Sequence, residues 1–184
     1  EFLSSHAPLK AEEKRFVWGR GPDNAALFDE RSREEELERV ESAKQWRQTK
    51  FDADFGWIAG PPELGGRGLP GRYDRTYAQV EARYQLPDQG CFGIGLGMVA
   101  PTILAHAIDE VRSDLLPKMW RGEIVGCQLF SEPGAGSDLA SLQLRAERDG
   151  EEWILNGQKV WTSGSHYSDI GEIIARTDPE LPKH

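Results

Sequence analysis

The sequence has little cysteine, no long apolar run and a deficit of positive charge. Its two cysteines, Cys91 and Cys127, have no cysteine or histidine at metal-ligand spacing, so we expect reduced thiols rather than a disulfide or a metal site. No apolar run approaches the length of a membrane span, and the chain opens without a signal-peptide pattern. The formal net charge of −9 argues against nucleic acid and anionic membranes as partners. These absences predict a cytoplasmic protein without a nucleic-acid or membrane partner.

The order of the predicted elements indicates the fold class. The 184 residues, 38% of them apolar, are enough for a sizeable core and for one or two domains. Helical patterns occupy four segments, residues 29–54, 72–85, 90–107 and 111–122. Strand patterns begin near Gly126, and helices followed by strands indicate α+β rather than alternating α/β. We therefore predict an all-helical domain over residues 1–125 and an antiparallel β-domain over residues 126–184.

The second predicted helix, residues 72–85, carries an aromatic stripe. Tyr73, Tyr77, Val80 and Tyr84 fall on one side of it. An apolar stripe at helical spacing is more often a core face than a cofactor site. We predict that this stripe lies in the core.

The prediction for the C-terminal part of the chain is an antiparallel meander. Residues 142–148 alternate apolar and polar side chains, which is typical of a half-buried strand. Asp149-Gly150 and Asn156-Gly157 are hairpin signals on either side of the short apolar run 153–155. Residues 159–163 follow as the third predicted strand.

A glycine-rich loop precedes this meander. Residues 131–138 read SEPGAGSD. Gly134 and Gly136 have no side chain, so their backbone N–H groups can approach a ligand or an anion closely. Ser131 and Ser137 add hydroxyl groups. Most clusters of glycine, proline and serine are plain turns, so composition alone leaves both a turn and a ligand-binding loop open.

Trp161 lies on the third predicted strand and has two possible roles. It is either a core residue or an aromatic wall for a planar ligand. Large aromatic side chains dominate protein cores, so burial is the expectation from the residue alone.

The loop SEPGAGSD and the later stretch NGQKVWTSG, residues 156–164, resemble the acyl-CoA dehydrogenase family. The family's middle-domain signature is an E-P-x-A-G-S-D loop followed by an N-G-x-K-x-W-[IT]-[ST] hairpin. Both halves are present here, in that order and at that spacing, and a weaker likeness extends back to Asp29. In the family the β-domain continues further and a C-terminal helical bundle follows. The resemblance therefore implies the N-terminal helical domain plus part of a truncated middle β-domain.

The resemblance implies an activity, a cofactor and partners. Members of this family use FAD to dehydrogenate an acyl-CoA thioester to the 2-enoyl-CoA: a carboxylate removes the α-proton and the flavin accepts a hydride from the β-carbon. The family's base lies in its C-terminal domain, so we assign no catalytic residue in this chain. The implied partners are an acyl-CoA substrate, an electron-transfer flavoprotein or similar acceptor, and further subunits in a homo- or hetero-oligomer. A non-catalytic partner subunit and an acyl-CoA oxidase remain open alternatives.

The resemblance also implies nine FAD-binding positions: Gln128, Leu129, Phe130, Ser131, Gly136, Ser137, Trp161, Thr162 and Ser163. Residues 128–131 match the strand end along the flavin ring, and Ser131 would bond its pyrimidine edge. Gly136 and Ser137 match positions near the pyrophosphate, and Ser137 also lies near the substrate's CoA arm. Residues 161–163 match the strand beside the isoalloxazine.

Three residues of these motifs need separate comment. Many family members carry tyrosine where this chain has Gln128, so the contact to the ring differs here. The QLFSEPGAGSD form is similar to bacterial members, some of which act on steroid or branched acyl-CoAs. Glu132 and Asp138 are predicted to brace the turn rather than to act as bases.

Overall fold

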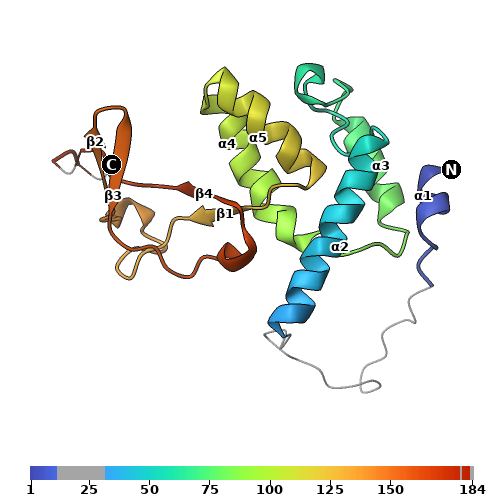
Figure 1. The fold of residues 1–184 in the computed structure, drawn as a ribbon, viewed down its shortest axis with the longest axis horizontal. Helices are drawn as coiled ribbons and strands as arrows, with labels where there is room; N and C mark the ends of the chain where they lie inside the picture. The colour runs from blue at the N-terminus through green and yellow to red at the C-terminus, as the bar shows by residue number, and fades with distance from the viewer. Residues whose placement is uncertain (12–31, 179, 183–184) are drawn as a thin grey trace. The chain divides into compact units, whose positions relative to one another are not determined.

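The computed structural model describes residues 1–11, 32–178 and 180–182 of the chain (Figure 1). It contains two compact units, Glu1–Gln89 and Gly90–His184. The observed division lies earlier than the predicted change from helices to strands near residue 125. The two helices between residues 100 and 121 group with the strands instead of with the first helices. The domain boundary at residues 125 and 126 therefore stays a prediction. The first residues of the predicted helix 29–54 lie outside the described part of the chain.

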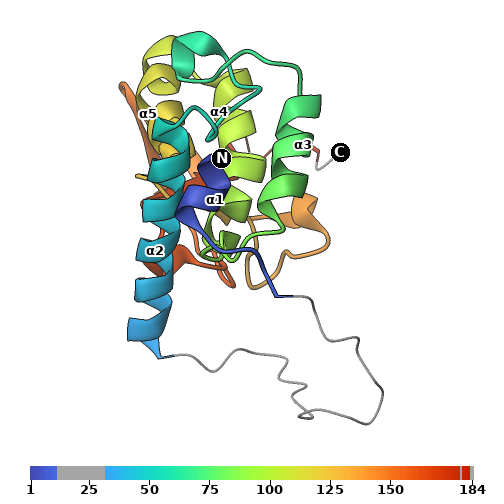
Figure 2. The same cartoon turned by 90° about the vertical axis from the view of Figure 1, so that its right-hand side faces the viewer.

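The first unit is built around one long helix. Helix α2 (Arg33–Asp52) begins at a capping box, in which Ser32 Oγ accepts from Glu35 N at 3.2 Å and Ser32 N donates to Glu35 Oε2 at 2.8 Å. The short helix α1 (Phe2–His6) lies beside it (Figure 2), with the Phe2 ring 5.9 Å from that of Trp46. This arrangement gives α2 an aromatic neighbour that the sequence patterns did not predict.

The third helix, α3 (Arg72–Glu81), is joined to α2 by a partly buried ion pair. Lys50 Nζ donates to Glu81 Oε1 at 3.1 Å, and Trp46 Nε1 donates to the same oxygen at 3.0 Å. Burial lowers the pKa of Lys50, and the nearby Arg47 lowers it further, against the opposing effect of Glu81. The pair fixes α3 relative to α2 within this unit.

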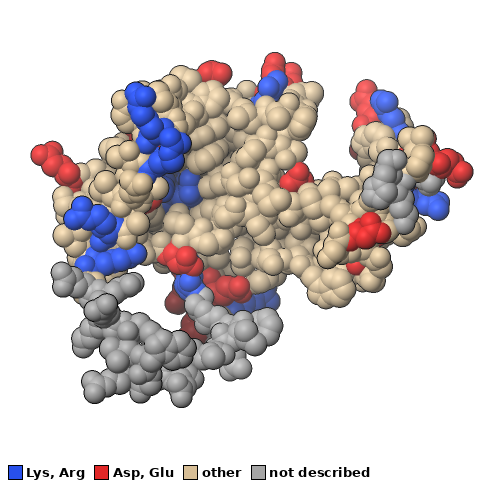
Figure 3. All heavy atoms as spheres, turned by 180° about the vertical axis from the view of Figure 1, so that it is seen from behind, with Lys and Arg blue, Asp and Glu red and all other residues tan. Residues whose placement is uncertain are grey.

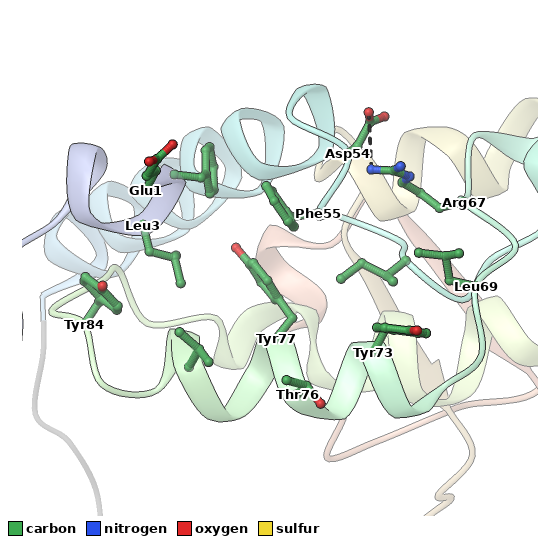
Figure 4. Close-up of a pocket in the computed structure, with 13 residues that line it drawn as sticks. Glu1, Leu3, Asp54, Phe55, Arg67, Leu69, Tyr73, Thr76, Tyr77 and Tyr84 are labelled. Carbon is green, nitrogen blue, oxygen red and sulfur yellow. Dashed lines mark ion pairs between the residues drawn. The ribbon is translucent and has the colours of Figure 1, made fainter.

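The aromatic stripe of α3 does not lie in the core, so that prediction was wrong. No residue of α3 is buried, and the stripe lines a cavity of about 360 Å³. Figure 4 shows Tyr73, Tyr77 and Tyr84 on the α3 side of this cavity, with Leu3 from α1 opposite. The loop that contains the 3₁₀ turn η1 (Pro62–Leu64) contributes Arg67 and Leu69 to the lining of this cavity. The stripe is apolar because it faces this cavity, which periodicity cannot distinguish from a filled core.

Helices of the second unit precede its strands. They are η2 (Gly90–Phe92), the π-turn η3 (Gly95–Val99), α4 (Ala100–His106) and α5 (Asp109–Arg121). Helix α5 ends at Gly122, whose φ of 88° is left-handed. Strand β1 (Gly126–Leu129) crosses η3 at two glycines, because a Cβ added to Gly95 would lie 2.9 Å from Gly126 N. This close approach positions β1 against the helices.

The strands form two separate pairs. Strand β1 pairs in parallel with β4 (Ile170–Ile173), with Gln128 opposite Glu172. Strand β2 (Arg145–Asp149) pairs antiparallel with β3 (Glu152–Asn156). The α+β class and the first hairpin are confirmed. The buried side of the alternating segment is also as predicted: Leu142, Leu144 and Ala146 are buried.

The third strand of the meander was a wrong prediction. Residues 159–163 are not a strand. Gly157 has a φ of 152° and fits so tightly that an added Cβ would lie 2.8 Å from Leu144 Cα. Trp161 has a φ of 54°, which a strand does not accommodate. Strand β4 instead pairs with β1, and its short IGEI sequence gave no strand signal.

The β2–β3 hairpin carries charges of both signs. Figure 3 shows acidic and basic side chains side by side at this end of the second unit. Trp153, Ile154 and Leu155 of β3 are about half exposed among them. In the described residues no helix has the length and apolar character to cross a membrane, and no group of three His, Cys, Asp or Glu could hold a metal.

Candidate functional site

Strand β1 delivers the first predicted site residues. Gln128 and Leu129 end the strand, and Phe130 and Ser131 follow it directly; all four are half-buried. The parallel pairing to β4 is tight here, because a Cβ on Gly171 would lie 2.6 Å from Leu129 Cδ1. The strand end is therefore held firmly from one side.

Gln128 has an unsatisfied amide. Its Nε2 atom is buried and has no hydrogen-bond partner in the described chain. A buried donor without a partner costs roughly 1–3 kcal/mol, so such atoms are uncommon. An acceptor atom on a ligand would satisfy it.

Glu132 lies near the start of the loop and is buried. Its carboxylate accepts from Gln143 N at 2.6 Å, Leu144 N at 3.0 Å and Lys159 Nζ at 2.8 Å. Burial acts to raise the pKa of Glu132, but the hydrogen bonds from Lys159, Gln143 and Leu144 outweigh it and hold the pKa below its ordinary value. Glu132 is thus an ionised brace, as predicted.

Asp138 braces the other end of the loop. Its carboxylate accepts a hydrogen bond from Ser141 Oγ, and its carbonyl accepts from Ser141 N at 3.1 Å. Both bonds stay within the loop and the 3₁₀ turn η4 (Leu139–Ser141) that follows it. The predicted bracing role of Asp138 is confirmed.

Between these braces the loop is open. Gly134, Gly136 and Ser137 are exposed, and a Cβ added to either glycine would meet no atom within 4 Å. The glycines are therefore not required for packing within the described chain. Such an open backbone suits the close approach of a ligand, which was the functional reading of these glycines.

The stretch 157–163 lies against the loop. Val160 N donates to Ser131 O at 2.9 Å, and Lys159 Nζ donates to Phe130 O at 2.9 Å. Directly after them, Trp161 is 78% exposed, so the expectation of a core residue was wrong. The left-handed backbone at Trp161 turns its side chain out of the path that a strand would give it. Thr162 is half-buried and Ser163 is exposed.

The structure thus brings together two of the three predicted groups of site residues. Hydrogen bonds join residues 128–131 to the segment that carries residues 161–163. Gly136 and Ser137, the third group, lie on the loop that follows Ser131, and the described residues show no hydrogen bond from them to residues 161–163. An unsatisfied amide, an open glycine loop and an exposed planar side chain fit an extended ligand that has both a ring system and an anionic part. That all nine residues bind FAD remains a prediction.

Lys159 is a residue of this site that sequence reasoning missed. It was placed on a strand, whereas its ammonium reaches the loop from a side chain that is only 5% exposed. The available signal was a lysine followed directly by the apolar residues Val160 and Trp161, 27 residues after an acidic residue in a glycine-rich loop. Buried charges require such a partner.

Comparison with known proteins gives consistent matches. The family description "Acyl-CoA dehydrogenase, middle domain" matches residues 127–184. The acyl-CoA dehydrogenase IpdE1 of Mycobacterium tuberculosis is 37% identical over 149 residues, which cover 81% of this chain and 38% of that protein. The acyl-CoA dehydrogenase FadE34 of the same organism is 56% identical over 85 residues, 46% of this chain and 12% of that protein.

Solved structures agree. The chain is similar to the Tcur3481-Tcur3483 steroid ACAD, with a TM-score of 0.65 and 31% identity over 79% of this chain and 40% of that one. It is also similar to the ChsE4-ChsE5 complex of Mycobacterium tuberculosis, with a TM-score of 0.60 and 28% identity over 85% of this chain and 46% of that one. The chain spans less than half the length of each of these proteins.

Proposed function

Because the chain belongs to the acyl-CoA dehydrogenase family, we propose that it serves the FAD-dependent α,β-dehydrogenation of an acyl-CoA thioester to the 2-enoyl-CoA. One observation carries the proposal. The bond from Val160 N to Ser131 O, 2.9 Å long, joins the two motifs of the resemblance. It leaves the Gln128 amide and the Trp161 ring available to a ligand near the joined segments.

In this proposal the chain's residues bind and orient the cofactor. FAD supplies the ring that accepts a hydride. Ser131 and the Gln128 amide offer hydrogen bonds to the ring edge, and Trp161 flanks the ring face beside Thr162 and Ser163. The open loop at Gly136 and Ser137 offers N–H and hydroxyl donors to the pyrophosphate, and Ser137 also to the CoA arm. No residue of this chain is proposed as the base.

We further propose a bulky acyl-CoA as substrate and an electron-transfer flavoprotein or similar protein as acceptor, in the cytoplasm. The substrate proposal is supported by the name of one similar structure, a steroid ACAD. A second role, that of a partner subunit in a hetero-oligomer, is supported by two similar structures whose names join two proteins.

The test is an anaerobic titration of the purified, complete gene product with straight-chain, branched and steroid acyl-CoAs. We expect visible flavin bands that bleach with one class of acyl-CoA, because substrate oxidation reduces the bound flavin. Bands that resist every acyl-CoA would support the partner-subunit role instead. A protein that binds no FAD, even when FAD is added in excess, would contradict the proposal.

A further inference from the structure

Three segments of the second unit converge on one buried ion pair. The Glu132 carboxylate receives hydrogen bonds from the backbone of residues 143 and 144 and from Lys159. Both side chains of the pair are only 5% exposed. The loop, the lead into β2 and the stretch after β3 are therefore tied to one point.

The second bond of Lys159 connects this point to the predicted flavin contacts. Lys159 Nζ also donates to Phe130 O at 2.9 Å, while the next residue, Val160, donates from its N–H to Ser131 O. Phe130 and Ser131 lie on one side of these bonds, and Trp161 follows Val160 directly. The ion pair thus sets how far apart the two halves of the candidate site lie.

Stability alone does not account for such a pair. Taking two charges out of water has a large desolvation cost, and apolar residues of similar volume often replace buried pairs without loss of stability. What the pair provides is fixed geometry together with electrical neutrality next to the site. Removing one partner would leave a single buried charge beside Phe130 and Ser131.

We propose that Glu132 and Lys159 are positioning residues for the flavin: they hold residues 128–131 and 161–163 at the spacing of the ring, and they cancel each other's charge beside it. This inference rests on the proposed function. It predicts that the two single substitutions affect the bound flavin in opposite directions. Glu132→Gln leaves a cation, which favours the more negative reduced flavin, and Lys159→Met leaves an anion, which disfavours it.

The experiment compares the complete gene product as wild type, E132Q, K159M, the E132Q/K159M double variant and K50M. Lys50→Met is the matched control because it removes the buried lysine of another ion pair, that with the partly buried Glu81 in the first unit. The FAD dissociation constant is measured by flavin fluorescence, and the midpoint potential of the bound flavin by spectroscopic reduction. Unfolding curves show that each variant is folded; if E132Q does not fold, K159M against K50M decides.

We expect each single variant to weaken FAD binding at least about tenfold, since it leaves a buried charge unpaired. The potential should rise in E132Q, fall in K159M and return toward the wild-type value in the double variant, while K50M leaves both quantities unchanged. Shifts of the same sign in both variants, or shifts that K50M reproduces, would overturn the inference. Unchanged FAD binding and potential in K159M, with a wild type that binds FAD, would overturn it and leave the proposed function standing. A wild type that binds no FAD would remove both.

Discussion

At the scale of single residues, Trp161 is unusual because it is large, apolar and 78% exposed, on a left-handed backbone. Left-handed φ is uncommon outside glycine and carries a cost, so it is retained where the surrounding structure fixes it. Here the fixing contacts are those of the two preceding residues, through Lys159 to Phe130 and through Val160 to Ser131. The ring is therefore presented by the backbone, whether or not a ligand covers it.

Trp161→Ala is expected to weaken FAD binding about 5- to 30-fold, which corresponds to the loss of about 1–2 kcal/mol of stacking. Trp153→Ala is the matched control, because Trp153 is 54% exposed on β3 and is not among the predicted site residues. Fluorescence titration with FAD measures both variants. Neither exposed side chain should change the free energy of unfolding by more than about 0.5 kcal/mol. An equal loss of affinity in the two variants would contradict the assignment of Trp161.

At the scale of elements, the crossing of η3 and β1 decides where the site begins. The two elements approach so closely that only glycine fits at Gly95, with Gly126 opposite. Gly97, two residues further along η3, has no neighbour within 4 Å of an added Cβ. The sequence shows glycine at every second position from 93 to 97. The structure assigns a packing role to Gly95 and none to Gly97.

Gly95→Ala is expected to destabilise the protein by about 1–3 kcal/mol, because the added methyl group collides with the backbone of β1. Gly97→Ala should be neutral or stabilise by up to about 1 kcal/mol, since it adds no clash and reduces the entropy of the unfolded chain. Urea unfolding of both variants tests this difference. Similar midpoints for the two would show that β1 moves away from η3 at low cost.

At the scale of the whole molecule, stability depends on pH through carboxylates whose pKa is lowered in the folded state. The pKa of Glu132 is lowered from its ordinary 4.5 by Lys159 and backbone N–H groups despite burial, and that of Glu35 is lowered by hydrogen bonds from Ser32. A lowered folded pKa means that the unfolded chain binds protons more readily. The stabilisation is therefore complete well above pH 4.5 and is lost as the pH falls through 4.5 toward the folded pKa.

The wild-type protein should accordingly keep its urea resistance at pH 6 and lose it as the pH falls through 4.5, because the unfolded chain with its ordinary carboxyl pKa of 4.5 takes up protons first. Glu132→Gln should be less stable at pH 6, because Lys159 is left unpaired, but its stability should fall less steeply in acid. Glu151→Gln, in the exposed hairpin turn, is the control and should keep the wild-type slope. Parallel curves for wild type and E132Q would show that Glu132 does not carry this dependence.

The sequence by itself determined the features that depend on neighbours along the chain. The alternation of Leu142, Leu144 and Ala146 fixed the buried face before β2, and Asp149-Gly150 fixed the turn of the β2–β3 hairpin, because side-chain direction and turn type are local properties. The two motifs, by their residues and spacing, indicated the family, and Glu132 was correctly taken as a brace.

Only the tertiary structure decided the rest. The parallel pairing of β1 with β4 joins segments about 44 residues apart, and the short sequence of β4 carries no local strand signal. Lys159 was predicted on a strand, but its ammonium instead binds the buried Glu132 carboxylate and the Phe130 carbonyl. Only the folded chain brings these two partners near it. The exposure of Trp161 and the cavity beside α3 follow in the same way, since periodicity states which side chains share a face but not what that face meets.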